Sequence, residues 1–154
     1  MSDTAFKPQD PQFREKASAS FAAQPAMHLV GARLLRVDPG EVEIALPYSS
    51  AITQQHGFVH GGITGMIADS AAGYAAFTLM PPGSSPLTVE YKINMLNPAH
   101  GEALVARARV VKSGRTLVVT TGDVFALRDG TEVHCATMQQ TLIVMRGVAD
   151  TKRA

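Results

Sequence analysis

A histidine and two glycines, His60-Gly61-Gly62, stand at the entrance to a helix-like segment. The sequence from Ile63 to the residue before Asp69 has no acid, so nothing nearby neutralises the partial positive charge and free N–H groups of a helix start. Such N–H groups can hold a developing negative oxygen. Asp69, two turns further along, could act as a base or a nucleophile. Together these residue types indicate acyl transfer.

The element that must position these groups is one long helix, predicted from Gly62 to about Leu79. Most of its residues are small, and Pro81-Pro82-Gly83 ends it. Gly73 costs roughly 1 kcal/mol relative to alanine inside a helix. We therefore expect another backbone to approach the long helix closely at Gly73.

A short helix and two strands are predicted before the long helix. Asp10 is the expected cap of the short helix, with Pro11 at its first position and Pro25 at its end. The alternating pattern predicts strands at 27–37 and 41–46.

Four further strands are predicted after the long helix, separated by turn-forming residues. They lie at about 87–96, 102–112, 116–127 and 132–145. One long helix with a run of antiparallel strands is an α+β arrangement. We expect three regions: a leader with a short helix at 1–24, one domain at 25–147 and a tail at 148–154.

The composition argues against several classes of protein. The chain has 154 residues, of which 45% are hydrophobic and 18% charged, which suits one compact domain. The formal net charge is +1 and the basic residues are scattered, so nucleic-acid binding is not expected. The single cysteine, Cys135, excludes an intrachain disulfide. Without a signal-peptide pattern or an apolar run near the ~20 residues of a membrane span, we expect a cytoplasmic protein with no membrane partner.

The ordered set of motifs resembles the hotdog-fold acyl-CoA thioesterases, in particular their phenylacetate-type (PaaI-like) branch. The likeness extends from about Leu29 to Met145. Its motifs are Gln54-x2-Gly57-x2-His60-Gly61-Gly62, Asp69, Ala71-x-Gly73-Tyr74-Ala75-Ala76, Leu87 to Asn94, Asn97-Pro98-Ala99 and Ser113-Gly114-Arg115-Thr116. The resemblance implies a long central helix wrapped by a largely antiparallel sheet of about six strands, and hydrolysis of a CoA thioester.

The resemblance also assigns roles at the helix entrance and on the helix. Asp69 would be the catalytic carboxylate, and the Gly61 N–H would polarise the thioester carbonyl. His60 would orient this loop or bind near the thioester, and Gly62 would belong to the substrate-binding turn. Whether Asp69 attacks to form a mixed anhydride or deprotonates water stays open.

Other positions carry roles by resemblance. Gln54 would bind or orient the attacking water or the carboxylate, and Thr88 would lie near the water. Arg115 would contact the CoA moiety, and Tyr74 would line the pocket. In such enzymes the site is shared between subunits, so we expect a dimer or tetramer, commonly a homotetramer, that acts on aryl- or medium-chain acyl-CoA.

Each of these residues also has an ordinary structural interpretation. Asp69 could be a solvated position on an amphipathic helix, and His60 a structural loop residue. Arg115 could be a solvated turn residue. His56 and His60 are four apart, as in a metal pair on a helix, but Gly57 spoils that geometry, so we expect neither metal nor cofactor.

Two other functions fit the same fold. One is a non-catalytic acyl-CoA binding protein, and the other is a dehydratase acting on 3-hydroxyacyl thioesters. Fold alone does not decide between them. The combination of Asp69 with Gly61-Gly62 favours hydrolysis.

Overall fold

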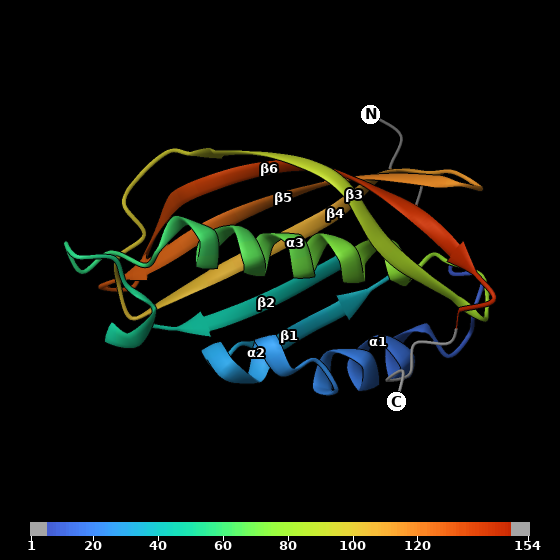
Figure 1. Cartoon of the computed structure of the whole chain (residues 1–154), viewed down its shortest axis with the longest axis horizontal. Helices are drawn as coiled ribbons and strands as arrows, with labels where there is room; N and C mark the ends of the chain where they lie inside the picture. The colour runs from blue at the N-terminus through green and yellow to red at the C-terminus, as the bar shows by residue number, and fades with distance from the viewer. Residues whose placement is uncertain (1–5, 149–154) are drawn as a thin grey trace.

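One long helix lies inside a curved antiparallel sheet in the computed structural model, which describes residues 6–148 (Figure 1). The helices are α1 (Phe13–Ala22), α2 (Pro25–Val30) and α3 (Gly61–Phe77), with a short 3-10 turn at Ser50–Ile52. The strands are β1 (Arg33–Asp38), β2 (Glu41–Pro47), β3 (Ser84–Met95), β4 (Ala103–Ser113), β5 (Leu117–Arg128) and β6 (Thr131–Arg146).

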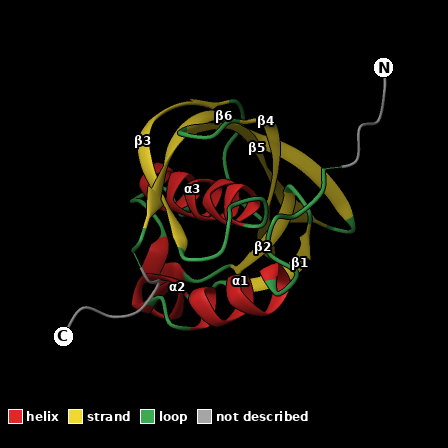
Figure 2. Cartoon of the chain, turned by 90° about the vertical axis from the view of Figure 1, so that its right-hand side faces the viewer, coloured by secondary structure: helices red, strands yellow, loops and turns green. Residues whose placement is uncertain are grey.

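The six strands form one sheet in the order β1-β2-β4-β5-β6-β3, and each neighbouring pair is antiparallel. The strand that follows α3 in the chain, β3, therefore lies at one edge of the sheet beside β6. Figure 2 shows α3 enclosed by the curved sheet, with α1 and α2 on the open side. The predicted α+β hotdog fold is confirmed.

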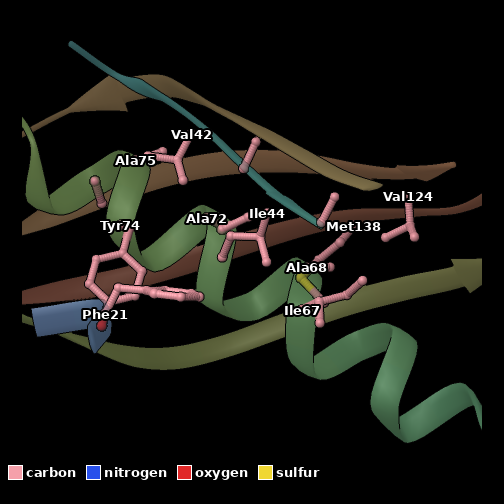
Figure 3. Close-up of a cluster of buried hydrophobic side chains, with 14 of the residues drawn as sticks. Phe21, Val42, Ile44, Ile67, Ala68, Ala72, Tyr74, Ala75, Val124 and Met138 are labelled. Atoms are coloured by element: carbon pink, nitrogen blue, oxygen red, sulfur yellow. The ribbon is translucent and has the colours of Figure 1, made fainter. Parts of the chain in front are cut away.

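The small residues of α3 let the sheet curve closely around it. The inward alanines of the helix are fully buried, and Ala68, Ala72 and Ala75 face strand residues such as Ile44 (Figure 3). The prediction that another backbone approaches the helix closely at Gly73 is wrong. A Cβ atom at this position would meet only Leu142 Cδ2, at the ordinary contact distance of 3.9 Å.

The predicted strand at 27–37 is wrong in its first half, which forms α2. Pro25 is pre-organised for a helix start, and Met27 and Val30 bury one face of the turn. Gly31, with φ +74, ends the helix in the left-handed conformation that glycine adopts without strain. Strand β1 begins only at Arg33.

The helix expected after Asp10 begins slightly later than predicted. Asp10 Oδ1 accepts a hydrogen bond from the Gln12 N–H at 2.9 Å, and α1 starts at Phe13. Phe21 of α1 packs edge-to-face against Tyr74 of α3, at 5.8 Å between ring centroids.

Between residues 6 and 148, no helix is long and apolar enough to cross a membrane.

Candidate active site

A hydrogen-bonded triangle holds the carboxylate of Asp69 on the middle of α3. Thr88 Oγ1 donates to Asp69 Oδ1 at 2.8 Å, and Gln140 Nε2 donates to the same oxygen at 2.6 Å. Gln140 Nε2 also donates to Thr88 Oγ1 at 2.8 Å, which closes the triangle. Within the described part of the chain, no donor reaches Asp69 Oδ2. One carboxylate oxygen is thus fixed by two donors, and the other accepts no hydrogen bond from residues 6–148.

A bulge in β3 sits beside Thr88. Thr88 pairs with Leu142 of β6, whereas Glu90 pairs with the adjacent Thr141, so Val89 is an extra, unpaired residue. Bulges bend a strand and re-aim a neighbouring side chain, and they are frequent next to active sites. The bulge at Val89 therefore accompanies the contact of Thr88 with Asp69.

Gln140 is a site residue that the sequence reasoning missed. It lies in the inward-facing row of β6, and its side chain is fully buried against α3. The other members of this row are apolar: Ala136, Met138, Leu142 and Val144. A polar residue in the core phase of an alternating strand was the available signal, because such a residue needs a buried partner.

A cavity of about 200 Å³ opens beside Asp69 and Thr88. Tyr74 lines it, and Tyr74 Oη lies 3.1 Å from Ser20 Oγ of α1. A second cavity of about 350 Å³ lies between α1 and the end of α3, and Phe77 and Ser20 line both cavities.

The entrance to α3 presents one free N–H group. His60 is the N-cap: its ring Nδ1 accepts the Gly62 N–H at 2.9 Å, and its carbonyl accepts from Ile63 and Thr64. The Gly61 N–H has no acceptor among residues 6–148, and Gly61 is exposed. A donor at a helix start, with no acid in the first turn, favours a negative ligand atom.

One chain does not bring this donor and the carboxylate together. Gly61 and Asp69 are eight residues apart on a continuous helix, which at 1.5 Å per residue is about 12 Å. That separation exceeds the reach of a single thioester carbonyl and its nucleophile.

Two other predicted residues make contacts of their own, away from Asp69. Gln54 Oε1 accepts the His56 N–H inside its own turn, which precedes α3. Arg115 is exposed in the turn between β4 and β5, where its carbonyl accepts from Arg146 at 3.2 Å. This turn lines a hollow with Leu79, which follows the C-terminal end of α3, opposite Gly61.

The described residues contain no group of three or more His, Cys, Asp and Glu side chains that could hold a metal ion. The buried thiol of Cys135 has its pKa raised by burial. It is therefore protonated and poorly nucleophilic at neutral pH.

Comparisons with known proteins agree with this fold. A family model described as the thioesterase superfamily matches residues 56–133. A solved structure of a thioesterase family protein from Silicibacter pomeroyi is 52% identical, covers 88% of this chain and 99% of that one, and has a TM-score of 0.87.

Two further similarities are more distant. Human acyl-coenzyme A thioesterase 13 is 31% identical over 91 residues, which are 58% of this chain and 64% of that protein. The chain thus spans less than two thirds of the length of that protein and of the first curated relatives it matches. The PaaI protein of the E. coli phenylacetic acid degradation operon has the same fold, with a TM-score of 0.80, 18% identity, and 91% of this chain and 98% of that one covered.

Proposed function

The chain belongs to the thioesterase superfamily, and from this premise we propose that it hydrolyses acyl-CoA thioesters to the free acid and CoA. The observation that carries the proposal is the carboxylate of Asp69, which is held by two donors on Oδ1 and lies at the wall of a cavity. One of these donors, Gln140, is fully buried. A carboxylate on a solvated helix surface would be hydrated by water and would not require such a donor.

Asp69 Oδ2 is the atom we assign to the chemistry. It would either remove a proton from water or attack the thioester carbon, with Thr88 and Gln140 holding the other oxygen in place. The thiolate of CoA leaves readily, so the mechanism needs no strong general acid.

The developing oxyanion would be held by the Gly61 N–H, beside the Gly62 turn that His60 caps. Because Gly61 and Asp69 of one helix are about 12 Å apart, we assign these two groups in each site to two different subunits. The homo-oligomer is therefore part of the proposal, as a dimer or a tetramer.

The edge strand β3 is a suitable surface for such an oligomer. It is 12 residues long, and no strand among residues 6–148 pairs with its outer side. Leu87 and Val89 on it are both 57% exposed, and Tyr91 is 46% exposed. A long apolar edge of this kind is suited to pairing with another strand.

The acyl group would enter the cavity beside Asp69, and its volume of about 200 Å³ suits an aryl or medium-length acyl chain. Tyr74 would line this cavity. Gln54, at the helix entrance, would orient water in the partner's site, and Arg115 would contact the CoA moiety from its exposed turn. We place the enzyme in the cytoplasm, where CoA thioesters are formed.

The test is CoA release from a panel of aryl and straight-chain acyl-CoAs by the wild type and Asp69→Asn. We expect turnover to fall by about a hundredfold or more in the variant, with substrate binding retained. Asp129→Asn is the matched control, because it makes the same change in an exposed turn whose φ of 48 suits asparagine. Tight binding without turnover by the wild type would instead support an acyl-CoA binding protein.

A further inference from the structure

We propose that Gln140 is a positioning residue that selects which oxygen of Asp69 carries out the reaction. The inference rests on the proposed thioesterase function. It assigns a role to a residue on β6, the strand whose Leu142 also lines the cavity beside Asp69.

The place of Gln140 in the fold is one where an apolar residue would normally stand. Its side chain is 0% exposed, in a row with Met138 and Leu142 that faces α3. Burying an amide is unfavourable unless its polar atoms find partners. A methionine of similar length would fill the same space without that penalty.

The hydrogen bonds of Gln140 are one-sided. Its Nε2 serves both Asp69 Oδ1 and Thr88 Oγ1, whereas its Oε1 is buried with no partner in the described part of the chain. An unpartnered buried oxygen lowers stability. The NH₂ group of the amide is therefore hydrogen-bonded toward Asp69 and Thr88, while its oxygen is not bonded. A local departure from good packing of this kind is typical of functional sites.

The triangle also fixes the orientation of the carboxylate. A single donor such as Thr88 would allow the carboxylate to swing about one hydrogen bond. A second donor on the same oxygen, anchored in the core by β6, removes that freedom. Asp69 Oδ2 is then held in one direction, toward the water or the thioester carbon.

The experiment compares the wild type with Gln140→Met in steady-state kinetics and thermal unfolding. We expect kcat to fall about tenfold to a hundredfold, the range for one lost hydrogen bond to a charged group. KM should change less than about twofold, since the amide does not touch substrate. The unfolding temperature should stay the same or rise, because the unpartnered oxygen is removed.

Thr120→Val is the matched control. Thr120 is also fully buried, lies opposite Gln140 on β5, and its hydroxyl donates to the backbone carbonyl of Gln140 rather than to Asp69. We expect its kcat to match the wild type. A Gln140→Met variant with unchanged kcat would overturn the inference alone. A variant whose unfolding temperature falls, with activity lost only in proportion to unfolding, would also overturn it. A wild type without turnover would overturn the proposed function and this inference with it.

Discussion

Gly61, with its free N–H, and Asp69, with its held carboxylate, lie on one uninterrupted helix eight residues apart, which separates their backbone positions by about 12 Å along the helix. Mutations can therefore test whether the two groups act in the same subunit or in different subunits.

Replacing Gly61 with proline should remove the proposed oxyanion donor and little else. Proline is favoured at the first position of a helix, and His60, with φ −58 and ψ 136, already has the extended conformation required before proline. We expect kcat to fall by about 10²–10³-fold, with circular dichroism and unfolding temperature near those of the wild type. Gly61→Ala, which keeps the N–H, is the control and should retain activity.

Mixing two inactive variants should restore activity if the site is shared. A mixed dimer of Gly61→Pro and Asp69→Asn chains has one site with both intact groups and one with neither. Random assembly should therefore give about a quarter of wild-type activity. Co-refolding or co-expression followed by the CoA-release assay measures this directly. A mixture that remains as inactive as its components would place both groups in one subunit.

Phe77 should limit the length of the acyl group, because it lines both cavities. We expect Phe77→Ala to join them and to raise kcat/KM for longer acyl-CoAs relative to shorter ones. Removing a large, partly buried ring should also lower stability by up to about 3–5 kcal/mol, so unfolding must be measured alongside. Phe125→Ala, on the charged outer side of the sheet, is a control for loss of an aromatic ring. An unchanged length profile in Phe77→Ala would show that the two cavities do not serve one substrate.

Acid should weaken the fold through the ion pairs on the outside of the sheet. Arg107 donates to both carboxylate oxygens of Glu132, at 2.7 and 2.5 Å, and holds the pKa of that carboxyl below its ordinary value of 4.5. A carboxyl whose pKa is lower in the folded state stabilises the fold above the ordinary value. That contribution is lost as the pH falls through the lower folded value.

Urea unfolding at pH 6.5 and at pH values below 4.5 should therefore show a gap between the wild type and Glu132→Gln that closes in acid. High salt should narrow the gap at pH 6.5, because the pair is exposed. A gap that stays constant with pH would mean that the ion pair contributes nothing to stability.

The long helix and the last four strands could be predicted because their patterns are regular and bounded by turn residues. Strand β3 begins at Ser84 where position 87 was expected, and the other bounds differ less. The segment that forms α2 was harder to predict, because six residues fit both the helical and the strand pattern of apolar positions. The burial of Met27 and Val30, which decides for a helix, comes from the tertiary fold.

The candidate site was predictable only in part. Asp69 and Thr88 could be placed by their motifs, and the structure brings them within 2.8 Å. Gln140 stands in the apolar phase of β6, but its partners Asp69 and Thr88 come from other elements, so its place in the site follows only from the fold. Gln54 and Arg115 remain predictions, since any contact they make with substrate depends on a second subunit.

The extra residue in β3 has a consequence for anyone who would redesign this sheet. Thr88 and Glu90 already pair with consecutive residues of β6, so deleting Val89 would leave both pairs intact and the ladder more regular. Idealised strands usually give more stable proteins. Here the irregular residue lies next to the hydroxyl that holds Asp69, so a more regular β3 would gain stability while losing the local bend that accompanies the contact of Thr88 with the carboxylate.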